Sequence, residues 1–107
     1  MNIFLTFDYE LFFGASTGTQ HHCIIRPTDE LIKIAEKHNV RFSFFIDCGY
    51  LVKLEEFKST DVNLKDDYET IVAQLKYLSA KGHDVQLHIH PHWEDSIFKD
   101  NKWVVDT

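Results

Sequence analysis

The sequence predicts an α/β fold in which parallel strands alternate with helices. Three short stretches, residues 2–7, 40–46 and 84–89, are rich in the apolar, β-branched and aromatic residues that strands prefer. Two stretches with apolar residues at helical spacing lie between them. The order strand, helix, strand, helix, strand is typical of right-handed βαβ units with parallel strands. A further short strand is expected over residues 98–105, and a chain of 107 residues is expected to form one domain at most.

The first half of the chain is predicted to hold two strands joined by a loop and a helix. Residues 2–7 form a nearly continuous apolar run, which is typical of a strand buried on both faces of a parallel sheet. Residues 11–27 are rich in Gly, Ser, Thr and Gln, so we expect a long loop of the kind that is often functional. A helix follows, with Thr28 as its cap and two acids in its first turn, and the second strand covers residues 40–46.

The second half is predicted to hold two helices before the third strand. Residues 50–57 favour a short helix, and the polar residues 58–65 favour an irregular segment. A strongly amphipathic helix then begins at a cap, either Asp66 or Asp67. It is expected to end just before Gly82, because glycine readily adopts the left-handed backbone conformation that often follows the end of a helix.

Composition excludes several classes of function. The net charge is −6 and Lys and Arg form no cluster, which excludes nucleic acid as a partner because phosphate binding needs concentrated positive charge. Cys23 and Cys48 are far apart in the sequence and are expected to be reduced thiols. We find neither a signal-peptide pattern nor an apolar run of membrane-spanning length, so the expected location is the cytoplasm.

Acidic residues follow the first two predicted strands, and alternating histidines end the third: Asp8, Glu10, Asp47, His88, His90 and His92. The carboxyl ends of parallel strands share one rim of the sheet, so we expect these side chains to lie together. One carboxylate and two imidazoles with open positions are a common arrangement in hydrolytic metal sites. The metal makes its bound water acidic, and a separate carboxylate then accepts the proton.

The spacing of these residues divides the expected roles among them. Asp8 and Glu10 share a face if the strand continues, so one is expected to bind the metal and the other to take the proton. The same alternation pairs His88 with His90. His83 follows a glycine that ends a helix, and we interpret it as a structural residue.

Three stretches resemble the NodB-type polysaccharide deacetylases of carbohydrate esterase family 4. Thr6-Phe7-Asp8 followed by a second acid resembles their first motif, and Phe-Ser-Phe-Phe-Ile at residues 42–46 resembles their second strand. Gly-His-Asp-Val-Gln-Leu-His at residues 82–88, continuing to His92, resembles their histidine motif. The resemblance implies a deformed (β/α) barrel, one Zn²⁺ or a similar ion such as Co²⁺ or Ni²⁺, and removal of N-acetyl groups from a sugar or polysaccharide precursor.

The resemblance also implies a catalytic base and three metal ligands, which are Asp8 and then Glu10, His88 and His92. Tyr9 stands where the family has its ligand aspartate, so the ligand role passes to Glu10, one residue later. The family's histidine ligands are four residues apart, which selects His92 as the second one. Strand alternation selects His90 instead, and His90 is therefore also a candidate ligand.

The family's domain is much longer than this chain, and its later motifs have no counterpart here. We therefore expect residues 1–107 to form a single partial domain, the N-terminal half of such a barrel. Because the missing part supplies the family's general acid, the isolated chain is expected to be inactive. An exposed strand edge is expected to favour a homodimer.

Two other hypotheses remain open beside a metal-dependent deacetylase acting on an N-acetylated carbohydrate. One is a non-catalytic, degenerate barrel fragment that binds carbohydrate or a protein partner. The other is a (β/α) hydrolase that uses paired carboxylates without a metal, as glycosidases do. The histidine cluster speaks against the second hypothesis.

Overall fold

A three-stranded parallel sheet lies at the centre of the computed structural model, which describes residues 2–12 and 16–105. Its strands are β1 (Thr6–Tyr9), β2 (Ser43–Asp47) and β3 (Asp84–His88), and they are neighbours in the order β1-β2-β3. The other elements are the π-helical turn η1 (His21–Ile25), helices α1 (Arg26–His38), α2 (Cys48–Phe57) and α3 (Val62–Ala80), the short 3₁₀ turn η2 (Pro91–Trp93), and strands β4 (Ile97–Lys99) and β5 (Lys102–Val104). The predicted α/β class with parallel strands is confirmed.

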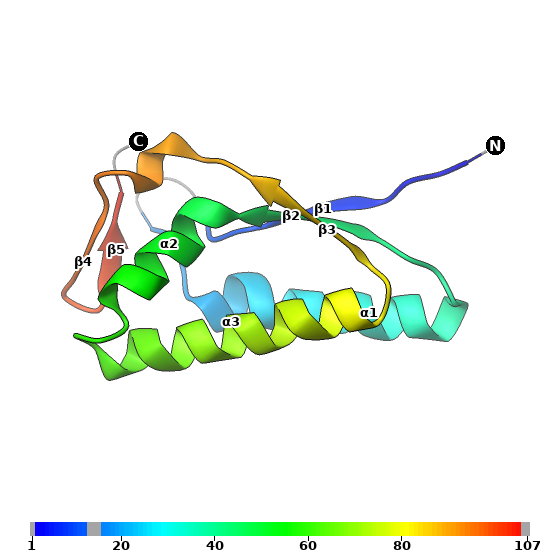
Figure 1. The fold of residues 1–107 in the computed structure, drawn as a ribbon, viewed down its shortest axis with the longest axis horizontal. Coiled ribbons are helices and arrows are strands. Elements are labelled where there is room, and N and C mark those ends of the chain that lie inside the picture. The colour runs from blue at the N-terminus through cyan, green and yellow to red at the C-terminus, as the bar shows by residue number, and fades with distance from the viewer. Residues whose placement is uncertain (1, 13–15, 106–107) are drawn as a thin grey trace.

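Helices α1 and α3 lie against the same face of the sheet (Figure 1). Tyr9, Phe44 and Ile46 point toward these helices and are buried. Asp8 and Gln86 lie on the opposite face and are exposed. The prediction that the first strand is buried on both faces is therefore wrong, because among the described residues only one face of the sheet is covered by helices.

The first strand begins later than predicted. Ile3, Phe4 and Leu5 are 73%, 80% and 51% exposed, and residues 2–5 extend away from the body as an N-terminal arm (Figure 1). Strand β2 begins only at Ser43, whose partner in β1 is Thr6 and whose N–H donates to the Leu5 carbonyl at 3.0 Å, so among the described residues no strand lies beside residues 2–4 of the arm. Apolar composition is therefore not sufficient for a strand, which also needs a partner for its backbone hydrogen bonds.

The expected loop over residues 11–27 is partly helical. Residues 13–15 lie outside the described residues, but His21–Ile25 form a π-helical turn that continues directly into α1. Ile24 and Ile25 are buried in the core, which explains why this segment folds against the body. Thr28 is not a cap; it is a buried residue inside α1.

Helix α3 begins four residues before the earlier of its two predicted caps, so the prediction of an irregular segment up to residue 65 is wrong. Asp61 is the cap, and its Oδ1 accepts hydrogen bonds from the backbone N–H groups of Asn63 and Leu64 at 2.8 and 3.2 Å. The helix ends as predicted, with Gly82 at a φ of +85°. The predicted short helix over residues 50–57 is confirmed by α2.

A polar cluster joins α3 to the rest of the fold. The Tyr9 hydroxyl donates to Gln74 Oε1 at 2.7 Å. Gln74 Nε2 in turn donates to the backbone carbonyl of Ile25 at 3.0 Å and to Asp29 Oδ1 at 2.9 Å. These buried bonds attach the middle of α3 to both β1 and the start of α1.

The predicted strand over residues 98–105 is a hairpin of β4 and β5, whose turn residues Asp100 and Asn101 both have positive φ. Trp103 of this hairpin packs against Tyr50 and Trp93, with ring centroids 6.1 and 5.3 Å apart. The hairpin thereby supports the segment that follows β3, where the histidines lie. Within the described ranges, we find no helix with the length and apolarity needed to cross a membrane.

Candidate metal centre

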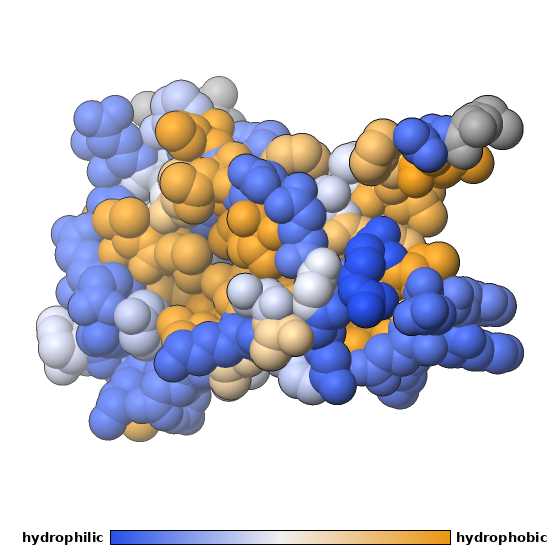
Figure 2. All heavy atoms as spheres, turned by 45° about the vertical axis from the view of Figure 1, so that its right-hand side comes forward, coloured by the Kyte–Doolittle hydropathy of each residue, from blue (hydrophilic) through white to orange (hydrophobic). Residues whose placement is uncertain are grey.

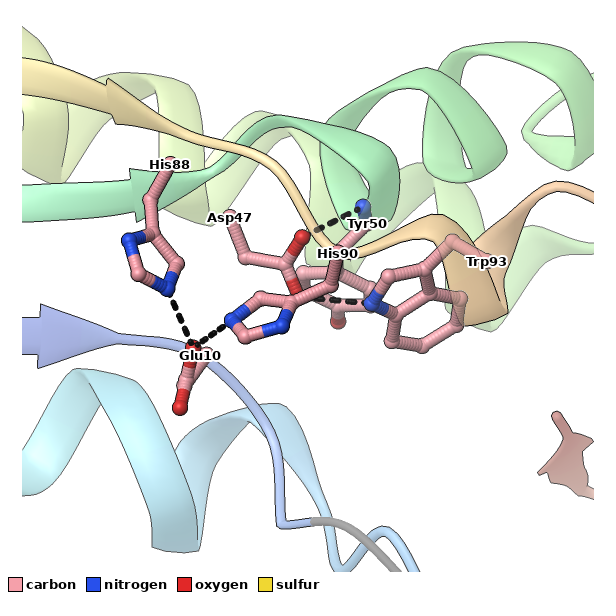
Figure 3. A network of polar contacts seen from close by, with 6 residues as sticks. All are labelled: Glu10, Asp47, Tyr50, His88, His90 and Trp93. Atoms are coloured by element: carbon pink, nitrogen blue, oxygen red, sulfur yellow. Dashed lines mark hydrogen bonds and ion pairs between the residues drawn. The ribbon is translucent and has the colours of Figure 1, made fainter. Parts of the chain in front are cut away.

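Glu10, His88 and His90 converge at the carboxyl ends of β1 and β3 (Figure 3). Glu10 Oε2 lies 2.6 Å from His90 Nε2 and 3.8 Å from His88 Nε2. The three candidate ligand atoms all lie within 4.8 Å of one another. Their side chains are 17–32% exposed, which leaves the group accessible from solvent.

The register of the parallel sheet explains this convergence. Asp8 aligns with Phe45, so Glu10, two residues later, is level with Asp47 at the rim. Asp47 in turn is paired with His88 of β3. Residues two apart on an extended chain point to the same face, so Glu10 and His88 approach each other on the face that the helices leave uncovered.

The donor set fits a divalent transition metal. A carboxylate oxygen and two imidazole nitrogens are ligands that Zn²⁺, Co²⁺ and Ni²⁺ accept. Three protein ligands also leave a coordination position for water or substrate, as in catalytic rather than structural zinc sites. Glu10, His88 and His90 are therefore the residues that would hold such an ion.

Tyr9 and Glu10 point in opposite directions from the end of β1. Tyr9, at the position of the ligand aspartate in the deacetylase motif, is 2% exposed and lies on the helix-covered face. Its pKa is raised, chiefly by burial and also by the nearby charge of Asp29, so it stays a neutral hydroxyl. Alternation along the chain thus brings Glu10, and not Tyr9, to the site.

Asp8 and His92 lie outside the group of three. Asp8 is exposed on the uncovered face of β1, the face toward which Glu10 also points. The His92 ring lies beside the group, with its centroid 5.4 Å from that of His90 and 5.3 Å from that of Trp93. Burial lowers the pKa of His92, and the charge of Asp47 acts in the opposite direction.

Asp47 has a structural role that the sequence did not reveal. Its Oδ2 accepts a 2.6 Å hydrogen bond from the indole N–H of Trp93, and its Oδ1 caps α2 by accepting from the Tyr50 N–H at 3.5 Å (Figure 3). The carboxyl is 1% exposed. Burial raises its pKa, while the bond from Trp93 and the nearby His90 oppose that rise. Asp47 therefore anchors the segment that carries His90 to the start of α2.

Gly49 allows Trp93 to come close to the start of α2. A Cβ atom at Gly49 would lie 2.8 Å from the Cβ of Trp93, closer than side chains approach each other. Only glycine allows the first turn of α2 to pack directly on Trp93. An Asp at a helix start with Gly two residues later is visible in the sequence, but its tryptophan partner is not.

We find no match to this chain among protein-family models, curated proteins or solved structures. The function is therefore argued from the group of three side chains and from the motifs themselves.

Proposed function

We propose that this chain carries the divalent metal centre of a hydrolase that removes N-acetyl groups from a carbohydrate. The observation that carries the proposal is the convergence of Glu10, His88 and His90 at one rim of a parallel sheet. The motifs that resemble those of polysaccharide deacetylases supply the reaction class and the N-acetylated substrate. The chemistry of the donor set supplies the metal, which we propose to be Zn²⁺, with Co²⁺ or Ni²⁺ as substitutes.

The strand order supports the barrel part of the proposal. Strands that follow one another in space as they do in sequence, with helices on one face only, are typical of (β/α) barrels. Doubly wound sheets instead reverse their strand order and carry helices on both faces. We therefore propose that the chain is the N-terminal part of a deformed (β/α) barrel, with the uncovered face as the interior.

The proposed role of Asp8 is the one that the resemblance to the deacetylases implies, and the roles of the other residues follow from the positions of their side chains. When bound, the ion acts as a Lewis acid that polarises the acyl carbonyl and makes water acidic near neutral pH. Asp8 accepts the proton from the attacking water. The water oxygen bonds to the carbonyl carbon, and the leaving nitrogen takes a proton from solvent as the C–N bond breaks. Acetate and the sugar amine are released, and Asp8 returns its proton to solvent. Asp47 is a positioning residue, because its hydrogen bond to Trp93 holds the segment that carries His90.

Metal uptake tests the centre directly. Calorimetric titration with Co²⁺ or Zn²⁺ should show about one ion per chain at neutral pH. His90→Ala should abolish uptake, whereas His92→Ala should retain it; His21→Ala, an exposed histidine in η1, is the matched control. No uptake by the wild-type chain would refute the proposal. Loss in His92→Ala with retention in His90→Ala would replace His90 by His92 as the ligand.

Asp8 is tested separately from the ligands. Asp8→Asn should bind the ion as the wild type does, because Asp8 lies outside the group of three. The assay uses p-nitrophenyl acetate, whose leaving group departs without a general acid, so it does not need the part of the family's site that this chain lacks. Metal-dependent hydrolysis should fall by about 10²–10⁴ in Asp8→Asn. An unchanged rate, or loss of the ion, would overturn the assignment of Asp8 as the base.

A further inference from the structure

We propose that the hollow beside His90 binds the apolar acyl chain of the substrate, so that the sugars acted on extend beyond N-acetyl to longer N-acyl groups. This hollow, which we call the acyl groove, has a volume of about 560 Å³, within the range of small-molecule sites. It runs between the first turns of α2 and the segment after β3. The inference rests on the hydrolase proposed above and specifies the group that its substrate carries.

The walls of the acyl groove are mainly apolar. Val52 contributes one wall from α2, and Ile89 and Pro91 contribute the other. Val52 and Ile89 are 62% and 75% exposed, so both side chains are accessible to a ligand in the groove. Trp93 also lines the groove, but its ring is buried. It therefore offers no exposed flat face on which a sugar ring could stack. These walls favour an aliphatic chain.

His90 belongs both to the acyl groove and to the candidate metal centre. Its Nε2 contacts Glu10 at 2.6 Å, while the same residue lines the end of the groove. A carbonyl group at the metal centre would therefore have its acyl chain at the mouth of the groove. This continuity selects the acyl part of the substrate, and not an unrelated ligand, as the occupant.

The charges around the acyl groove disfavour a free fatty acid. Lys53 is the cation among its lining residues, and its Nζ is already paired with Glu56 at 3.4 Å. Glu94 adds a negative charge, and the chain as a whole carries −6. A free carboxylate would be repelled, whereas an acyl chain in amide linkage carries no charge.

The acyl groove is also preorganised. Trp93 is held by its 2.6 Å hydrogen bond to Asp47, and Gly49 allows α2 to pack directly against it. The start of α2 and the segment after β3, which form the two walls of the groove, are thus held together through Trp93. A ligand that enters such a site does not have to order the walls, which reduces the entropic cost of binding.

The test compares glucosamine derivatives with acetyl, butanoyl, hexanoyl and octanoyl chains, titrated into the metal-free chain and followed by calorimetry or NMR. Each added methylene should tighten binding by about fourfold until the groove is filled, the factor expected for burying one CH₂ group. Val52→Ser should weaken octanoyl binding by about threefold or more. The matched control is Val62→Ser, the same change at a 70% exposed valine of α3 outside the groove, which should bind as the wild type does.

Affinity independent of chain length, or equal losses in the two serine variants, would overturn the groove assignment. A chain that binds Co²⁺ but shows no dependence on acyl length refutes the groove alone. A dependence on acyl length that is weaker in Val52→Ser, in a chain that takes up no metal, refutes the hydrolase and supports the groove. In the Co²⁺-loaded chain, the ion should broaden NMR signals near the probe's carbonyl more than those of its terminal methyl; the reverse order would overturn the proposed orientation.

Discussion

At the residue scale, buried polar side chains hold together segments that are far apart in the sequence. His83 is 7% exposed, and its Nδ1 accepts a 3.0 Å hydrogen bond from the backbone N–H of Phe42. That bond requires an unprotonated Nδ1. Burial lowers the pKa of His83, and the charge of Arg41 adds to the effect while Glu36 opposes it. His83 is therefore neutral in the folded protein, as expected for a structural residue.

This lowered pKa predicts a pH-dependent stability. In the unfolded chain His83 titrates near its ordinary pKa of about 6.5, so below that pH the unfolded state binds more protons than the folded state. The free energy of unfolding should be fully retained above about pH 6.5 and fall as the pH decreases toward the lowered pKa of the folded state. His83→Asn keeps an acceptor for the Phe42 N–H but cannot titrate.

Urea denaturation between about pH 5 and 7.5 measures the effect. The wild-type free energy of unfolding should decrease more steeply with falling pH than that of His83→Asn. The half-buried His92, whose pKa is also lowered, contributes equally to both proteins. Parallel pH profiles for the two proteins would contradict the role given to His83.

At the element scale, the ends of helices decide how much of the chain each helix includes. The two predicted caps of α3, Asp66 and Asp67, lie within the helix, and Asp61 caps it instead. Val62 and Asn63 have weak helix propensities, so the residues of the first turn did not indicate a helix. The helix includes them because Asp61 satisfies two backbone donors and because Leu64 is buried.

Asp61→Ala should therefore lower the free energy of unfolding by about 1 kcal/mol, the usual cost of losing an N-cap. Asp66→Ala is the matched control, because Asp66 is an exposed residue of the same helix and should change stability by less than about 0.5 kcal/mol. Chemical denaturation of the three proteins at one pH measures both values. If Asp66→Ala were the more damaging change, the helix would begin where the sequence suggested.

At the scale of the whole molecule, apolar surface remains uncovered at both edges of the sheet. Next to β1, the N-terminal arm exposes Ile3, Phe4 and Leu5, and it forms the apolar projection at the upper right of Figure 2. At the β3 edge, Leu87 and Ile89 are each 75% exposed. Open edges with apolar side chains favour pairing with another chain.

We therefore predict that residues 1–107 self-associate in a concentration-dependent way. Phe4→Lys should shift the population toward monomer, because a charge on an edge segment opposes strand pairing. Val62→Lys places the same charge on an exposed position of α3 and should leave the association unchanged. Sedimentation velocity over a range of concentrations measures it. A wild-type chain that stays monomeric throughout, or equal effects of the two lysines, would contradict the prediction.

Much of the sheet and of the helices could be predicted from the sequence, because the features that define them are local. The residues predicted for β2, α2 and β3 agree with these elements to within a few residues. The same local logic placed Glu10, His88 and His90 among the candidates, since each follows or ends a predicted strand. Strand alternation alone already placed Asp8 and Glu10 on one face.

Only the tertiary structure decided which candidates meet. His90 lies against Glu10, 80 residues away in the sequence, because Trp93 is held by Asp47 and packs on Gly49. Contacts of this kind depend on how separate elements pack, and periodicity carries no information about that. For the same reason the sequence determined that residues 3–5 are apolar, whereas the start of β2 at Ser43 decided that they lie exposed outside the sheet.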